Sequence, residues 1–170
     1  MSIYKLIWDD FCSWLLELIK PEYGQPIDKK TYLKVIALFE NNLRLLHPFM
    51  PFLTEELWHC IRPRNKENAL TISHWPKTKS YESSFISEFE MTKEIIAGIR
   101  NFRKEKGISF KERIDLNVSN SNTKLAYEAS IIKLGFVGEM NYQKPSENSF
   151  GGTFRVNNLE FFIPTDAFED

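Results

Sequence analysis

The sequence predicts a mainly α-helical protein, a helical bundle with a small α/β subdomain at its C-terminal end. Up to about Lys106, apolar residues recur at three- and four-residue steps, the spacing of one buried helix face. After Gly107 the apolar period changes to two, the spacing of a strand with one buried face. We therefore expect a helical domain over 1–107 and a small α/β subdomain over 108–170.

The first two helices are predicted on either side of a proline-rich loop. Apolar positions at helical spacing run from Ile3 to Ile19, and a loop with two prolines and a glycine follows over 21–26. Asp28 is suited to cap a second helix, because its carboxylate can accept the first unpaired backbone N–H groups. This helix is expected to end near His47.

A sharp turn and a short third helix are predicted next. The prolines in PFMPF at 48–52 disfavour a continuous helix, so we expect a turn that buries Phe49, Met50 and Phe52. Thr54 has the character of an N-cap for a helix that ends before Pro63. An irregular segment over 62–84 follows, with a strand-like stretch at 70–72.

The fourth helix is predicted over 85–106, with Gly107 as its C-terminal stop and the first three helices as its partners in a bundle. The alternating residues at 114–118 predict a strand. Further elements are expected in the subdomain: a helix at 124–134 and strands at 136–142, 152–156 and 159–163.

Composition places the chain among ordinary globular proteins, with 42% hydrophobic and 26% charged residues among 170. No stretch is apolar for long enough to span a bilayer, and the first residues lack the pattern of a secretory signal. We therefore expect a cytoplasmic protein without a membrane partner. The two cysteines, Cys12 and Cys60, are isolated and predict neither a disulfide framework nor a metal site.

Motifs for catalysis are absent from the sequence. It has no GxGxxG after a strand, no GxxxxGK and no HExxH, so neither a nucleotide cofactor nor a metal is predicted. Asp9 and Asp10 are adjacent on a helix and point about 100° apart, which disfavours joint action as acid and base. The three histidines are scattered. No catalytic residue is predicted.

The strongest functional signal from charge is a basic segment at the end of the fourth helix. Residues 93–113 contain seven Lys or Arg and three Glu, seven minus three or +4, although the whole chain carries −1. Arg100, Arg103 and Lys104 are spaced i, i+3, i+4 and share one helix face. We predict that they form an exposed ridge suited to a phosphate backbone. A merely solvated helix face is the alternative.

Several motifs together resemble one protein family along nearly the whole chain. They are WDDFCSW at 8–14, LRLLHPFMPFLTEELW at 43–58, SHWP at 73–76 and IRNFRKE at 99–105. In this order they resemble the anticodon-binding domain, with its adjoining C-terminal region, of the valyl-tRNA synthetase family. The block at 43–58 is the most specific, because its HPFMPF wording resembles the valine type more than the isoleucine or leucine types.

The resemblance implies the helical bundle of class I aminoacyl-tRNA synthetases and a role in binding valine-type tRNA. Both chain ends look cut, so we expect a non-catalytic, monomeric fragment. It would need no cofactor, while the rest of the parent synthetase chain uses ATP to attach valine to tRNA. Arg100, Arg103 and Lys104 would contact phosphates, and Asn101, Arg44 and Trp14 would contact bases or the loop.

Three alternatives to this assignment remain at the level of sequence. One is a helical protein-interaction module without RNA binding, which would use apolar grooves for a partner helix. Another is the equivalent domain of an isoleucine-type synthetase. An enzyme in its own right is the third, and the absence of catalytic motifs disfavours it.

Overall fold

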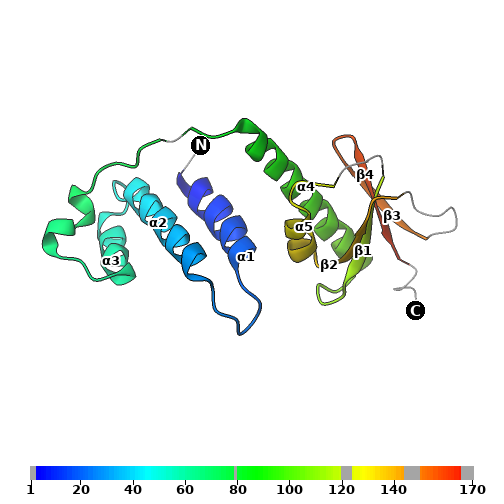
Figure 1. Ribbon diagram of the computed structural model, residues 1–170, viewed down its shortest axis with the longest axis horizontal. Helices are drawn as coiled ribbons and strands as arrows, with labels where there is room; N and C mark the ends of the chain where they lie inside the picture. Colours follow the sequence, from blue (N-terminus) through cyan, green and yellow to red (C-terminus); the bar gives the residue numbers. More distant parts are fainter. Residues whose placement is uncertain (1–2, 79, 120–123, 144–149, 166–170) are drawn as a thin grey trace. The chain divides into compact units, whose positions relative to one another are not determined.

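The computed structural model describes residues 3–78, 80–119, 124–143 and 150–165, and it divides into two compact units (Figure 1). The first unit, Met1–Ser80, is helical. The second, Tyr81–Asp170, combines helices with a four-stranded sheet. The predicted fold class, mainly helical with a small α/β part, is confirmed.

The first helix has an unexpected hydrogen-bond pattern. Lys5–Leu15 forms a π-helix, η1, which continues into the short α-helix α1, Leu16–Ile19. The Ser13 hydroxyl donates to the Trp8 carbonyl five residues earlier, at 2.9 Å. Apolar spacing predicted a helix here but not its wider turn. Phe11 is the buried residue of η1, and its ring stacks on Phe39 with the centroids 5.6 Å apart.

The second helix, α2, spans Lys29–Leu46 and begins at the predicted cap. The Asp28 carboxylate accepts the backbone N–H of Thr31 at 2.9 Å, and hydrogen bonding from Thr31 lowers the pKa of Asp28. The third helix, α3, spans Pro51–Ile61 with Met50 at its N-cap position, four residues earlier than expected. Proline fits the first turn, where no intrahelical partner exists for the backbone nitrogen.

Thr54 is therefore not an N-cap. It lies inside α3, completely buried, and its hydroxyl donates to the Met50 carbonyl at 2.8 Å. The prediction that Phe49, Met50 and Phe52 are buried is also wrong, since they are 71%, 45% and 91% exposed. Thr54 and Trp58 share the buried face of α3. Phe52 lies two residues before Thr54 and therefore points to the opposite, exposed side of the helix.

The core of the first unit forms around Leu43 of α2, Trp58 of α3 and Leu70. Leu70–Ile72 was predicted to be strand-like but is a single 3-10 turn, η3, which follows a similar turn, η2, at Lys66–Asn68. The turn places Leu70 in the core and leaves Ile72 63% exposed. Among the described residues of this helical unit, no neighbouring strand is present to pair with the segment.

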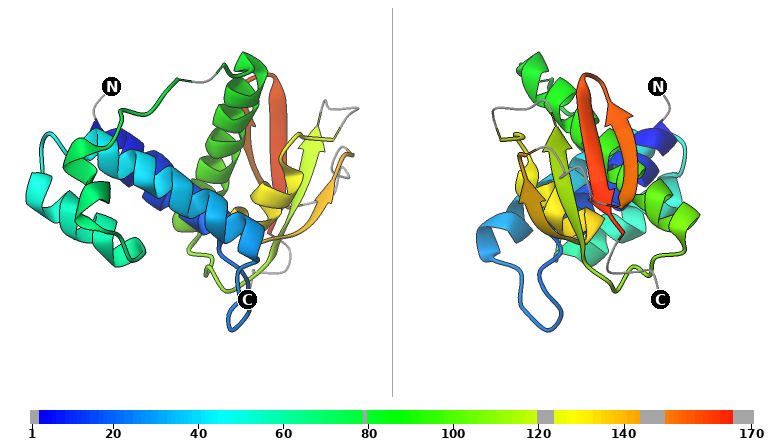
Figure 2. Two further views of the ribbon diagram at one scale, coloured as in Figure 1. Left: turned by 60° about the vertical axis from the view of Figure 1, so that its left-hand side comes forward. Right: turned by 90° about the vertical axis from the view of Figure 1, so that its right-hand side faces the viewer.

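The second unit contains the long helix α4, Ser83–Lys106, and a sheet with strand order β2-β1-β4-β3. Its other elements are β1 (Ile114–Ser119), α5 (Glu128–Gly135), β2 (Val137–Asn141), β3 (Gly151–Val156) and β4 (Leu159–Pro164). The β1 and β2 strands are parallel, and the other pairs are antiparallel. The predicted change from helix to strand is confirmed. Figure 2 shows α4 and α5 on one face of the sheet.

Close packing joins α4 to β3. A Cβ atom at Gly98 would lie 2.5 Å from the Phe154 ring, so only glycine allows this approach. The contacts of α4 therefore place it with the sheet, and the two compact units divide between Ser80 and Tyr81. The sequence predicted a boundary at Gly107 and a bundle that included this helix. The apolar period reports a change of secondary structure, whereas the units depend on which surfaces pack together.

Candidate nucleic-acid interface

The end of α4 carries the predicted basic residues, but they do not form one ridge. Arg100, Asn101 and Lys104 are exposed, whereas Arg103 is 1% exposed. The predicted exposed ridge is therefore wrong at Arg103. Ile96, Ile99 and Phe102 are buried on the same helix, and Arg103 follows Ile99 by four residues. That spacing was the signal in the sequence that placed Arg103 on the buried face.

Arg103 connects three segments of the second unit. Its guanidinium donates to the carbonyls of Ser109 at 2.8 Å, Gly135 at 3.2 Å and Phe136 at 2.9 Å. Burial lowers the pKa of Arg103, an effect that the Glu112 carboxylate partly offsets. The side chain therefore stabilises the chain after α4 against the end of α5, and it is not accessible to a phosphate.

Arg100 and Lys104 remain the exposed cations of this face. They are four residues apart, one helical turn, and Lys106, Lys111 and Arg113 are exposed further along the chain. Five cations within 14 residues create a positive surface at the end of α4, although Glu105 and Glu112 are also exposed there. Asn101 is exposed next to Arg100 and can supply neutral hydrogen bonds.

The other two predicted residues lie in the first unit. Trp14 is half-buried within η1. Arg44 is half-buried on α2, where its guanidinium carbon lies 4.7 Å from the centre of the Trp58 ring and one nitrogen donates to Asn41 Oδ1 at 2.9 Å. The sequence candidates are thus divided between the two units.

Arg44 belongs to a cationic cluster that the sequence did not predict. The Arg64 guanidinium carbon lies 3.8 Å from the centre of the same Trp58 ring, and its nitrogens contact the Trp58 carbonyl and the Glu40 carboxylate. Arg62 also pairs with Glu40, at 2.6 Å. The RPR sequence at 62–64 offered little signal, because one short basic stretch in a loop is usual for a solvated surface.

Glu55 of α3 holds the segment beside this cluster. Its two carboxylate oxygens accept the backbone N–H groups of Leu70 and Thr71 at 2.8 and 3.1 Å, and His59 Nε2 lies 3.2 Å from Oε1. Burial raises the pKa of Glu55, but these hydrogen bonds and the charge of His47 outweigh it, so the pKa is below its ordinary value.

A lowered pKa means that ionised Glu55 stabilises the fold above the unfolded-state pKa, and that this stabilisation disappears as the pH falls through the lower folded-state pKa. We expect Glu55→Gln to lower the free energy of unfolding by about 1 to 2 kcal/mol at pH 7, because the amide keeps one acceptor oxygen: one charge-assisted bond becomes neutral and the other backbone N–H loses its acceptor. The difference from wild type should diminish between about pH 5 and pH 3. Urea denaturation at several pH values measures it.

The neighbouring Glu56, which is exposed, provides the matched control for this prediction. Glu56→Gln should leave stability within about 0.5 kcal/mol of wild type, as is usual for a surface substitution. A constant difference between Glu55→Gln and wild type from about pH 7 to about pH 3 would contradict the role assigned to the carboxylate.

The described part of the chain contains no group of three or more His, Cys, Asp or Glu side chains that could hold a metal ion. Among the described helices, none is both long and apolar enough to cross a membrane. What the described surfaces offer is exposed cations, amide groups and a few accessible rings, the groups that contact phosphates and bases in RNA.

The family of the chain follows from its sequence relatives. The family described as "Anticodon-binding domain of tRNA ligase" matches residues 1–118. The match covers the first unit, α4 and most of β1, so the chain belongs to the anticodon-binding domain family of tRNA ligases.

Two individual relatives match nearly the whole chain, and a third matches about three quarters of it. The valine–tRNA ligase of Christiangramia forsetii is 49% identical over 165 residues, 96% of this chain and 19% of the relative. That of Porphyromonas gingivalis is 44% identical over 169 residues, 99% of this chain and 19% of the relative. That of Bacillus licheniformis is 37% identical over 129 residues, 73% of this chain and 14% of the relative. The chain thus spans about a fifth of the length of the first two.

Proposed function

We propose that this chain is the tRNA-binding part of a valine–tRNA ligase and that it holds the anticodon stem and loop of valine tRNA. The similarity to valine–tRNA ligases over nearly the whole chain, at up to 49% identity, carries this proposal. It favours the valine type over the isoleucine type. It also favours RNA binding over a protein-interaction module, because the family is named for the anticodon.

Binding without chemistry is the mechanism that these residues support. Cationic side chains attract the phosphate backbone and set its position, and amides and rings discriminate among unpaired bases. Arg100 and Lys104 suit the first role, because they are exposed one helical turn apart. Asn101 and Trp14 suit the second role, and Arg44 suits a contact to the anticodon loop. The ATP-dependent attachment of valine would belong to other parts of the parent chain.

Retention of tRNA tests the proposal directly. We expect the chain to bind valine tRNA more tightly than heparin of equal charge, and to bind it in preference to a tRNA of unrelated anticodon. Fluorescence anisotropy with labelled tRNA and unlabelled competitors measures both comparisons. Equal displacement by heparin and by valine tRNA would overturn the proposed function.

The salt dependence of binding tests the cations of α4. Replacing Arg100 and Lys104 together with Gln should lower the slope of log affinity against log salt by about 0.7 to 0.9 for each phosphate that the variant no longer neutralises. Arg103 is left unchanged, because its replacement would act on the fold. Arg155→Gln, an exposed arginine of β3, is the control and should leave the slope unchanged. An unchanged slope in the double variant would show that this face is only solvated.

A further inference from the structure

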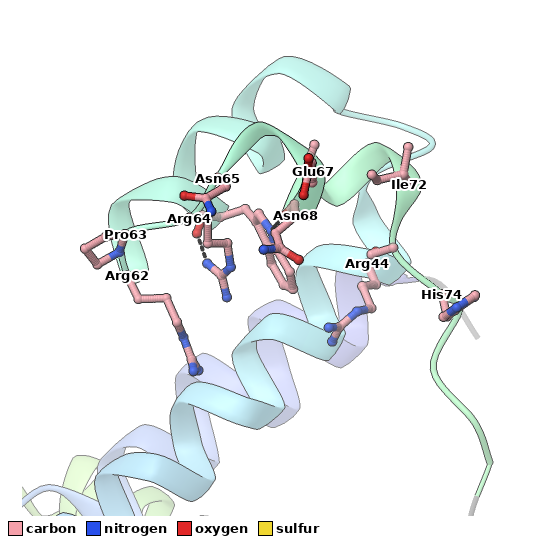
Figure 3. Close-up of a pocket in the computed structure, with 12 residues that line it drawn as sticks. Arg44, Arg62, Pro63, Arg64, Asn65, Glu67, Asn68, Ile72 and His74 are labelled. Atoms are coloured by element: carbon pink, nitrogen blue, oxygen red, sulfur yellow. Dashed lines mark hydrogen bonds between the residues drawn. The ribbon is translucent and has the colours of Figure 1, made fainter.

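A polar pocket of about 580 Å³ lies in the first unit, between α2 and the segment that follows α3 (Figure 3). Its lining includes three arginines, Arg44, Arg62 and Arg64, together with Asn65, Asn68 and His74. Figure 3 shows Arg62 and Arg64 reaching from the loop towards α2, which carries Arg44. Residues from two segments distant in sequence thus form one cationic site.

The charges of this pocket do not cancel. Glu40 is the carboxylate that pairs with both Arg62 and Arg64, through the same oxygen, Oε1. Glu67 is the acidic residue of the lining. Three arginines against these two glutamates leave a formal charge of +1, and one carboxylate oxygen shared by two guanidinium groups cannot satisfy all their donors.

The three arginines differ in what they can offer a ligand. Arg64 is fixed, with its side chain 9% exposed, between the Trp58 ring, the Trp58 carbonyl and Glu40. The side chain of Arg62 is 49% exposed. The Arg44 guanidinium has five N–H donors, and the bond to Asn41 engages one of its nitrogens. Arg62 and Arg44 therefore retain donors for a ligand.

The chemistry of the pocket favours a phosphate over a base. Trp58 is 4% exposed and two guanidinium groups already lie over its ring, so it cannot stack on a nucleobase. Guanidinium forks match the spacing of phosphate oxygens, and a guanidinium held by aromatic contact loses less entropy on binding than a free one. The side-chain amides of Asn65 and Asn68 add neutral donors.

We propose that this pocket binds a phosphodiester group of RNA, with Arg44 and Arg62 as its ligands and Arg64 as a positioning residue. The assignment rests on the proposed tRNA-binding function and adds a backbone contact in the first unit. It makes the first unit a second anchoring point, distinct in sequence from the cations of α4.

A short RNA provides the primary test. Labelled oligouridylate of six nucleotides should bind the wild-type chain, as measured by fluorescence anisotropy. Either Arg62→Gln or Arg44→Gln should lower the affinity at least tenfold. The same oligonucleotide with an uncharged methylphosphonate backbone should bind at least tenfold more weakly than the natural one. Arg155→Gln is the matched control, because Arg155 is also an exposed arginine paired with one glutamate, Glu160.

Several outcomes would overturn the assignment. They are the absence of oligouridylate binding, equal binding of the methylphosphonate form, and equal effects of Arg62→Gln and Arg155→Gln. Far-UV circular dichroism checks that both variants fold, and the separate Arg44→Gln variant keeps the Glu40 pairs intact.

Valine tRNA is measured in parallel. Retained tRNA binding with no effect of either variant would reject the pocket and leave the proposed function standing, whereas equal displacement of tRNA by heparin would reject the function itself.

Discussion

Arg103→Met is expected to destabilise the second unit by about 3 kcal/mol, because three backbone carbonyls would lose a charged donor at once. The carbonyls of Ser109, Gly135 and Phe136 lie at 2.8 to 3.2 Å from the guanidinium nitrogens. Methionine can fill much of the volume but donates no hydrogen bond. Unsatisfied buried acceptors are costly, whereas an exposed cation of α4 contributes little to stability.

The distribution of tryptophan allows this effect to be localised. All four tryptophans, Trp8, Trp14, Trp58 and Trp75, lie in the first unit, so their fluorescence reports on that unit alone. In urea denaturation, Arg103→Met should lower the midpoint of the transition measured by far-UV circular dichroism. The midpoint measured by fluorescence should change less. Lys104→Met, an exposed neighbour, serves as the control. Equal stability of the two variants would contradict the role of Arg103 as a structural link.

Trp58→Ala is expected to destabilise the first unit by about 3 to 5 kcal/mol, the usual cost of removing a large buried aromatic side chain. Trp58 lies in the core with Leu43 and Leu70, and its indole N–H donates to the Asn68 carbonyl at 2.8 Å. Arg44 and Arg64 both rest on its ring. The substitution would therefore leave a cavity and also release the two guanidinium groups.

Trp75→Ala is the matched control for this prediction, since Trp75 is 60% exposed while Trp58 is 4% exposed. Fluorescence of the remaining tryptophans during urea denaturation should show a large loss of stability for Trp58→Ala and a change within about 0.5 kcal/mol for Trp75→Ala. Similar losses for both variants would mean that the ring of Trp58 is not the centre of this core.

Local signals in the sequence predicted most secondary structure. Asp28 predicted the start of α2, Gly107 the end of α4, and the alternation at 114–118 the first strand. These signals work because a cap, a left-handed glycine and a period of two each act within a few residues. Thr54 was misassigned because a hydroxyl residue before two glutamates fits both a cap and a helix interior.

Tertiary structure decided the site. The sequence predicted Arg100, Arg103 and Lys104 as one exposed ridge, but in the structure Arg100 and Lys104 are exposed while Arg103 is a buried link. Its spacing from Ile99 was visible, yet only packing against the end of α5 supplied the carbonyls that make burial of a cation tolerable. Arg62 and Arg64 lie in one cationic cluster with Arg44 because the chain after α3 contacts α2, where both pair with Glu40.

The sequence by itself determined the family, the order of helices and strands, and the region of highest positive charge, because these depend on residue identity and local periodicity. The tertiary structure alone decided that α4 packs with the sheet, that Phe49, Met50 and Phe52 are exposed, and that Arg44 meets Arg64 on Trp58. Each of these depends on contacts between segments distant in the chain, whose energy no local pattern reports.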